Sequence, residues 1–94
     1  MEVWVFHGQE ARLASGVFST REQAENWIRR YGLTGLLTSY PLGEGMYDWA
    51  VTNTPFRAKR ADQTTPGFIG RFTSAYRPHE HFREGRGSTE REDT

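Results

Sequence analysis

The chain has 94 residues, a formal net charge of zero and no cysteine. This length corresponds to one domain, and the lack of cysteine excludes disulfides, thiol catalysis and thiolate metal sites. Six Phe, four Tyr and three Trp supply large buried area per side chain, so a core can form although only 35% of the residues are hydrophobic.

The first residues, the lengths of the apolar runs and the distribution of charge exclude further classes of protein. The first residues lack the basic start and apolar run of a signal peptide, and no apolar run approaches the ~18 residues of a membrane span. Residues 53–82 hold four Arg and one Lys against two acids, whereas residues 1–52 hold four Arg against six acids. We therefore expect a cytoplasmic protein that does not enter membranes and lacks the basic footprint of a dedicated nucleic-acid binder.

Residues 3–7 alternate apolar side chains on both faces, with Val3 and Val5 on one and Trp4 and Phe6 on the other. This pattern predicts a central strand that is covered on both sides. A short polar turn follows, and residues 13–18 are predicted to return as an antiparallel second strand.

A helix is predicted over residues 21–31. Ser19 with Glu22, and Thr20 with Gln23, both fit the capping box that satisfies free N–H groups at a helix start. Gly32 suits the left-handed position after the last turn. The apolar positions repeat at helical spacing and form one stripe toward the core: Ala24, Trp27, Ile28 and Tyr31.

Residues 34–40 and 46–51 are predicted to form a second hairpin around a turn rich in Gly and Pro at 41–45. The segment 65–82 is predicted to add a strand or a turn, and Thr65 followed by Pro66 fits the start of a short helical turn. Residues 83–94 contain no apolar side chain, so we expect a disordered polar tail after a domain over 1–82.

The fold class is accordingly α+β. We expect an antiparallel sheet of four to five strands in the order β-β-α-β-β plus the C-terminal strand or turn, with one principal helix on one face. The other face would be covered by the 65–82 segment, by the preceding loop or by a partner. The predicted core residues are Trp4, Phe6, Phe18, Trp27, Ile28, Leu36, Tyr47 and Trp49.

Several stretches together resemble a family of small bacterial domains with no assigned activity. They are 4–8 (WVFHG), 15–20 (SGVFST), 24–28 (Ala24 with Trp27-Ile28), 33–35 (LTG), 40–49 (YPLGEGMYDW) and 65–75 (TPGFIGRFTSA). The resemblance spans residues 3–82. It implies a fold of the kind described above and implies no catalytic residue and no cofactor.

Two groups of side chains could carry chemistry. His79 and His81 share one face if their segment is a strand, and His7 or Asp48 could complete a zinc site, against the alternative of surface histidines. Asp48, flanked by Tyr47 and Trp49, could act with Glu44 as an acid/base pair, against the alternative of solvated carboxylates. No metal, cofactor or catalytic residue is assigned on these grounds.

A third group is basic and aromatic. Arg57, Lys59, Arg60 and Arg71 with Phe56 and Tyr76 could hold single-stranded nucleic acid weakly, against the alternative of a solvated loop.

The aromatic content exceeds what one helix and one sheet readily cover, and an uncovered aromatic patch marks a partner surface. We therefore expect a non-enzymatic module that binds another protein, as an inhibitor, an immunity factor or a regulator of bacterial or phage origin. A second copy of the chain is an alternative partner. The residues predicted to bind the partner are Tyr40, Tyr47, Asp48, Phe56, Arg57, Arg71 and Tyr76.

Overall fold

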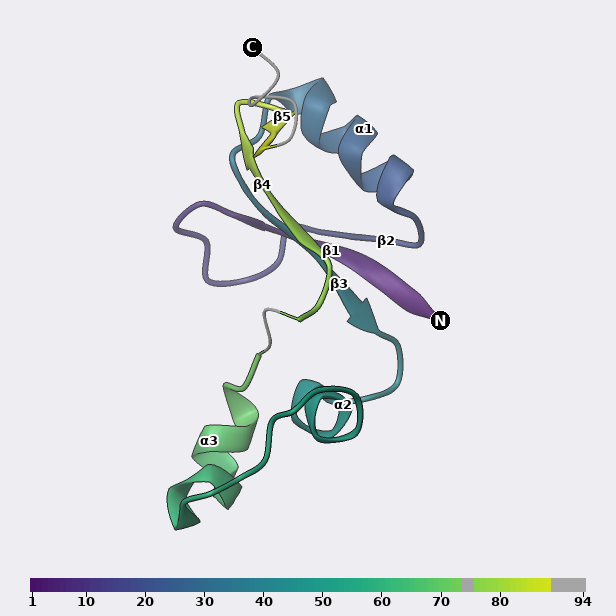
Figure 1. Cartoon of the computed structure of the whole chain (residues 1–94). Helices are drawn as coiled ribbons and strands as arrows, with labels where there is room; N and C mark the ends of the chain where they lie inside the picture. The colour runs from purple at the N-terminus through teal and green to yellow at the C-terminus, as the bar shows by residue number, and fades with distance from the viewer. Residues whose placement is uncertain (74–75, 89–94) are drawn as a thin grey trace.

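A computed structural model describes residues 1–73 and 76–88. Within these residues, five strands, three α-helices and one 3₁₀ turn follow one another along the chain (Figure 1). In order they are β1 (Glu2–Gly8), β2 (Gly16–Phe18), α1 (Arg21–Tyr31), β3 (Gly35–Pro41), α2 (Met46–Asn53), the 3₁₀ turn η1 (Ala61–Thr64), α3 (Pro66–Gly70), β4 (His79–Arg83) and β5 (Arg86–Gly87).

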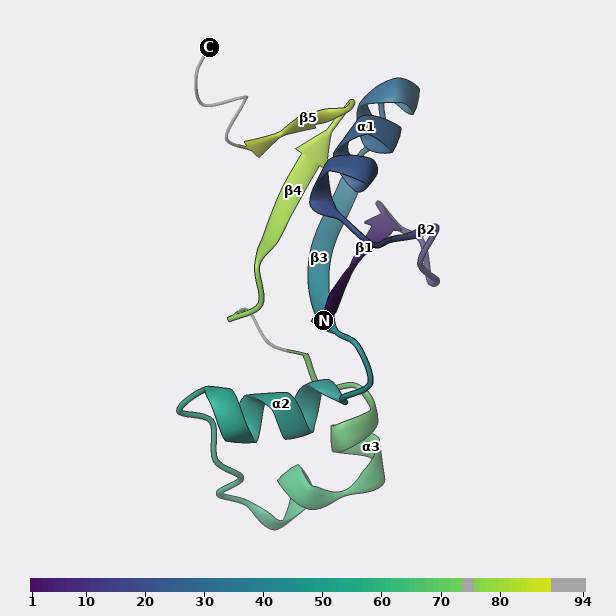
Figure 2. The ribbon, with the colours of Figure 1, turned by 90° about the vertical axis from the view of Figure 1, so that its right-hand side faces the viewer.

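The strands form one antiparallel sheet in the order β2-β1-β3-β4-β5. Helix α1 lies along one face of this sheet (Figure 2). The α+β class, the antiparallel sheet and the principal helix on one face are thus confirmed. Strand β1 lies inside the sheet, as predicted, between β2 and β3, but among the described helices only α1 covers it, on one face and not on both (Figure 2).

The core lies between α1 and the sheet. Its buried members come from three strands and one helix: Phe6, Ala24, Ile28, Leu37 and Phe82. Trp27 packs beside them, with its ring centroid 6.0 Å from that of Phe6 and 5.4 Å from that of Phe18. Ala24, Trp27 and Ile28 of the predicted helical stripe therefore face the core, whereas Tyr31, also predicted to face it, is 58% exposed.

Both predicted ends of α1 are confirmed. The Thr20 hydroxyl oxygen accepts a hydrogen bond from the Gln23 backbone N–H at 3.2 Å, and the Gln23 side-chain oxygen accepts one from the Thr20 N–H at 3.3 Å. Gly32 takes the left-handed conformation with φ of 61°. Local chemistry alone fixes these boundaries.

The second predicted hairpin is wrong, because residues 46–51 belong to helix α2. Tyr47, Trp49 and Val51 alternate along the sequence as on one face of a strand, but Tyr47, Ala50 and Val51 also share a helical face. A short apolar run does not distinguish the two periods, and Asp48 in the first turn of α2 favours the helix by its interaction with the helix dipole.

Three of the predicted core residues also lie elsewhere. Leu36 is on the sheet face opposite α1, because it alternates with the buried Leu37. Tyr47 packs in a separate aromatic cluster, and Trp49 contacts the guanidinium of Arg77. The positions of Tyr47 and Trp49 follow from the helical state of α2, whereas that of Leu36 follows from the alternation of side chains along β3.

The segment 65–82 contains both a helix and a strand. Thr65 caps α3, its hydroxyl oxygen accepting from the Phe68 N–H at 3.3 Å, with Pro66 as the first helical residue, as predicted. The expected disordered tail is wrong for residues 83–87, which form the end of β4, a turn with positive φ at Glu84 and Gly85, and β5. Residues 89–94 of that expected tail lie outside the described residues.

The region between β3 and β4 forms a separate helical layer. It comprises α2, η1 and α3, and it lies beyond the end of the sheet where β3 finishes (Figures 1 and 2). Four aromatic rings pack inside it, with centroids 4.8–6.5 Å apart: Tyr47, Phe56, Phe68 and Phe72. Because this layer lies at the end of the sheet, the 65–82 segment does not cover the face opposite α1.

Arg77 joins the helical layer to the sheet. Its side chain is only 10% exposed, donates to the Ser39 carbonyl oxygen at 2.7 Å and to the Glu2 carboxylate at 3.0 Å, and lies 4.9 Å from the Trp49 ring. The Ser39 hydroxyl also donates to Glu2. That hydrogen bond, aided by the Arg77 charge and opposed by desolvation, lowers the pKa of Glu2 from its usual value.

Candidate functional site

The sheet face opposite α1 is the candidate functional surface, and we call it the open face. Side chains alternate between the two faces of a strand, and Phe6 and Leu37 point into the core. The strand residues of the other parity therefore form the open face: Val3, Val5, His7, Val17, Leu36, Thr38, Tyr40, His79, His81, Arg83 and Arg86. Among the described helices, only α1 lies along a face of the sheet (Figure 2).

The middle of the open face is apolar. Val17 pairs with Val5 across β2 and β1, and Tyr40 pairs with Val3 across β3 and β1. Val17 is 65% exposed, and Leu13 in the loop that leads to β2 is 80% exposed. When another molecule covers such a surface, its apolar side chains leave water. The favourable free energy of that burial drives association.

The ionisable side chains of the open face are all bases. Within the described strands they are His7, His79, His81, Arg83 and Arg86. The two strand carboxylates, Glu2 and Glu80, have the opposite parity and lie on the α1 side. Glu80 is 9% exposed there and forms an ion pair with Arg21, whose guanidinium also lies 5.4 Å from the Trp4 ring. The open face therefore carries basic side chains on β4, β5 and the end of β1, beside an apolar area on β1, β2 and β3.

A pocket of about 480 Å³ lies at one end of this face. His7, Leu36 and His81 stand in one cross-strand row on β1, β3 and β4. Neighbouring strands are about 4.8 Å apart, so the backbones that carry the two histidines are roughly 10 Å apart, with Leu36 between them. Gln9, Thr34 and Arg83 complete the polar lining.

His79 lies beside His81, and their ring centroids are 6.0 Å apart. The His79 Nδ1 lies 2.8 Å from the carbonyl oxygen of Arg77, which can only accept, so Nδ1 carries the proton. Among residues 1–73 and 76–88, no group of three or more His, Asp or Glu side chains could hold a metal ion. The three candidate metal ligands thus gather on one face in two pairs, His79 with His81 and His7 with His81.

A family model described as "Domain of unknown function (DUF7710)" matches residues 3–88. The chain belongs to the DUF7710 family. The match agrees with the resemblance drawn from the sequence, which likewise carried no activity. No curated protein and no solved structure matches the chain. In the described part of the chain, the helices are all too short or too polar to cross a membrane.

The predicted partner-binding residues of this DUF7710 domain are distributed over two regions. Tyr40 is on the open face, whereas Tyr47 and Phe56 pack into the aromatic cluster of the helical layer. Asp48 is exposed on α2, and Tyr76 is exposed in the connection that leads to β4. The structure therefore does not bring these residues together into one patch.

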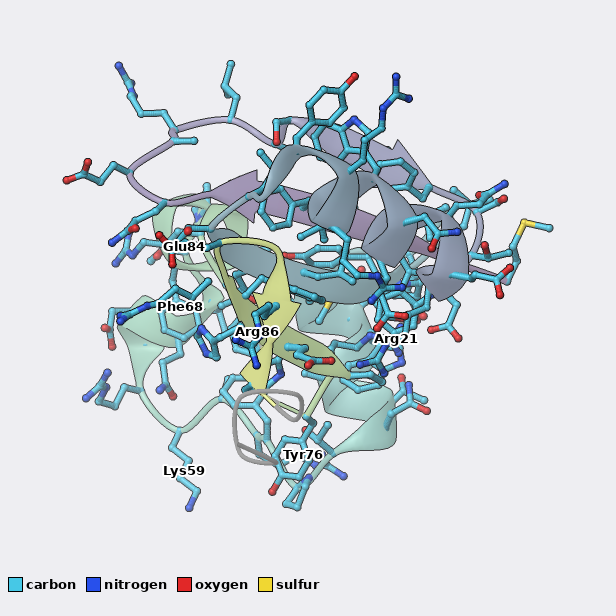
Figure 3. The ribbon with its side chains drawn as sticks, turned by 90° about the horizontal axis from the view of Figure 1, so that it is seen from above. Arg21, Lys59, Phe68, Tyr76, Glu84 and Arg86 are labelled. Carbon is cyan, nitrogen blue, oxygen red and sulfur yellow. The ribbon has the colours of Figure 1, made fainter. Side chains whose placement is uncertain are left out.

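The basic residues of the helical layer have partners within the layer. Arg57 donates to the carbonyl oxygens of Val51 at 2.9 Å and Thr54 at 3.1 Å, and so closes the C-terminal end of α2. Arg71 donates to the Gly67 carbonyl oxygen at 3.0 Å. Arg60 pairs with Asp62 at 3.2 Å, while Lys59 lies at the edge of the layer (Figure 3). Arg57 and Arg71 thus hold local structure.

Glu44 and Asp48, the candidate acid/base pair, are both exposed at the start of α2. The histidines are on the sheet, so the structure does not join carboxylates and imidazoles in one site.

Gln9, Thr34 and Arg83 were missed by the sequence reasoning. For Arg83 a signal was available, because it follows His79 and His81 at steps of two residues and so lies on the same strand face.

Proposed function

We propose that this domain is a non-enzymatic module that binds another protein through the open face. The observation that supports this most directly is the apolar part of that face, which reaches from the central strands to the exposed Val17 on the edge strand β2 and has bases on its other side. Interfaces of this kind combine an apolar core with a polar rim.

We extend the proposal to a bacterial cytoplasmic inhibitor, immunity factor or regulator. A chain without cysteine suits a compartment in which disulfides do not form.

The test is capture of a partner from the native host by the tagged domain, with Val17→Asp as the interface variant. We expect the wild-type domain to retain one defined protein in an amount close to its own. Val17→Asp should lose this protein, since a charge in the apolar part of the open face is costly to bury. Ile69→Asp is the matched control, because Ile69 is an exposed apolar residue of α3, remote from the open face. Equal recovery by all three proteins, or recovery of the bait alone, would contradict the proposal.

Nucleic acid is the less favoured partner in this proposal. Four cations are the sequence candidates for binding nucleic acid. Of these, Arg57 and Arg71 bind carbonyl oxygens and Arg60 pairs with an acid. Phosphate binding requires clustered cations and weakens steeply with salt. We expect no submicromolar binding of single-stranded or duplex oligonucleotides at ~150 mM salt in a fluorescence-anisotropy titration.

A further inference from the structure

We propose that the pocket between His7, His81 and Arg83 is an anion site that receives a carboxylate side chain of the partner protein. The domain would then select an acidic partner segment. This inference rests on the interaction role proposed above and adds the class of partner.

The lining of the pocket supplies donors. Two imidazoles, the Arg83 guanidinium and the Gln9 amide all carry N–H groups. The Thr34 hydroxyl oxygen accepts from the Glu84 backbone N–H at 2.9 Å, so its own proton is available to donate. Arginine binds carboxylates through two parallel hydrogen bonds, and no carboxylate is among the described residues that line the pocket.

Among residues 1–73 and 76–88, the acids near this face do not line the pocket. Glu2 and Glu80 lie on the other side of the sheet, held by Arg77 and Arg21. Glu84 is in the turn after β4 (Figure 3) and does not line the pocket. Glu10 is in the loop after β1 and, like Glu84, does not line the pocket. The described acids therefore leave the site open to a carboxylate of the partner.

The bases of the open face also favour an acidic segment over a second copy of the chain as the partner. Two copies of the chain that met face to face would place two sets of these bases, His7, His79, His81, Arg83 and Arg86, in one interface with no carboxylate from the described strand residues of that face. Like charges across an interface are unfavourable, whereas an acidic segment is complementary. The apolar floor at Leu36 continues into Val5 and Val17, so an apolar side chain next to the acid can be covered as well.

The experiment follows the imidazole signals of the three histidines by NMR at pH 6.0. The probe is a blocked five-residue peptide with one leucine between two pairs of glutamates. We expect saturable shifts at His7 and His81 and smaller ones at His79, whose Nδ1 is engaged by the Arg77 carbonyl.

Arg83→Gln should weaken the peptide at least fivefold, and His81→Gln is a second variant at the same site. Arg30→Gln is the control, because Arg30 is an exposed guanidinium on α1, next to Tyr31, and should change affinity less than twofold. The same peptide with glutamine in place of glutamate should cause no saturable shift. Backbone spectra that match wild type establish that each variant is folded.

The proposal is overturned if the glutamate peptide causes no saturable shift at His7 and His81, or if Arg83→Gln binds it as tightly as wild type. It is also overturned if inorganic phosphate moves the same signals at lower concentration than the peptide. If Val17→Asp loses the captured partner and Arg83→Gln retains it, the interaction role stands and this inference falls. If the peptide binds as expected and Val17→Asp still captures the same proteins as wild type, the interaction role falls instead.

Discussion

Gly35→Ala tests the close approach of β1 and β3, on which the core and the pocket both depend. A Cβ atom at this position would lie 2.2 Å from the His7 carbonyl oxygen, 2.7 Å from Cζ of Phe6 and 2.9 Å from Cα of Gly8. Two of these atoms are backbone atoms of the neighbouring strand, so a side-chain rotation cannot relieve the contacts. The strands must separate or the Phe6 ring must leave its place.

Overpacking of this kind costs about 1–3 kcal/mol, and the backbone contacts favour the upper end of that range. Alanine restricts the unfolded chain more than glycine, which returns about 0.4–1 kcal/mol. We expect a net loss of roughly 2 kcal/mol, which corresponds to a fall in Tm of about 8–16 °C for a domain of this size.

The measurement is thermal and urea unfolding followed by circular dichroism. Gly70→Ala is the matched control, because its Cβ would meet no atom within 4 Å and Gly70 is in helix α3. That variant should be as stable as wild type or up to about 1 kcal/mol more stable. A Gly35→Ala protein as stable as the Gly70→Ala protein would refute the reasoning from the strand contacts.

Trp27→Ala should cost about 3–5 kcal/mol by loss of core aromatic packing, and a Tm within a few degrees of wild type would show that the core face of α1 is misassigned. Arg21→Ala should lower the free energy of unfolding, measured with urea, by about 2 kcal/mol, because it leaves the Glu80 carboxylate buried without this cation. A loss as small as that expected for a pair of exposed charges would contradict a role of this ion pair in stability. The lowered pKa of Glu2 means that its hydrogen bond from Ser39 stabilises the fold above pH 4.5 and loses that effect as the pH falls through the lowered value. The difference in unfolding midpoint between wild type and Glu2→Gln should therefore be present at pH 7 and fade at acidic pH; a difference unchanged with pH would contradict it.

The parts of the fold that the sequence predicts are those with local chemical signals. Thr20 and Gln23 mark the start of α1, Gly32 marks its end, and the spacing of Trp27 and Ile28 identifies its buried face. Each of these signals acts within a few residues and does not depend on the rest of the chain. The helix was for that reason predicted over about residues 21–31, in agreement with the structure.

Helix α2 could not be predicted in the same way. Tyr47, Ala50 and Val51 fit a helical stripe, while Tyr47, Trp49 and Val51 fit a strand face, and both patterns are short. The choice depends on Phe56, Phe68 and Phe72, which cover Tyr47 from distant positions in the chain, and on Arg77, which covers Trp49. Tertiary contacts decide the state of such a segment.

The candidate site was predicted only in part. The sequence singles out three histidines and places His79 and His81 on one face, but it gives no register between β1, β3 and β4. That register sets His7 opposite Leu36 and Leu36 opposite His81, and so creates the pocket. Arg83 was assigned to a tail because no apolar residue follows it, although it is the last residue of β4.

The position of the helical layer between two paired strands has a consequence for the order of folding. β1, β2, α1 and β3 are consecutive in the chain, whereas β4 pairs with β3 only after residues 42–78 have closed a long loop. Loop closure costs about 0.6 kcal/mol for each doubling of length, so contacts made by β4 should form late. Truncation of Phe82 should then mainly speed unfolding, while truncation of Phe6 should also slow folding.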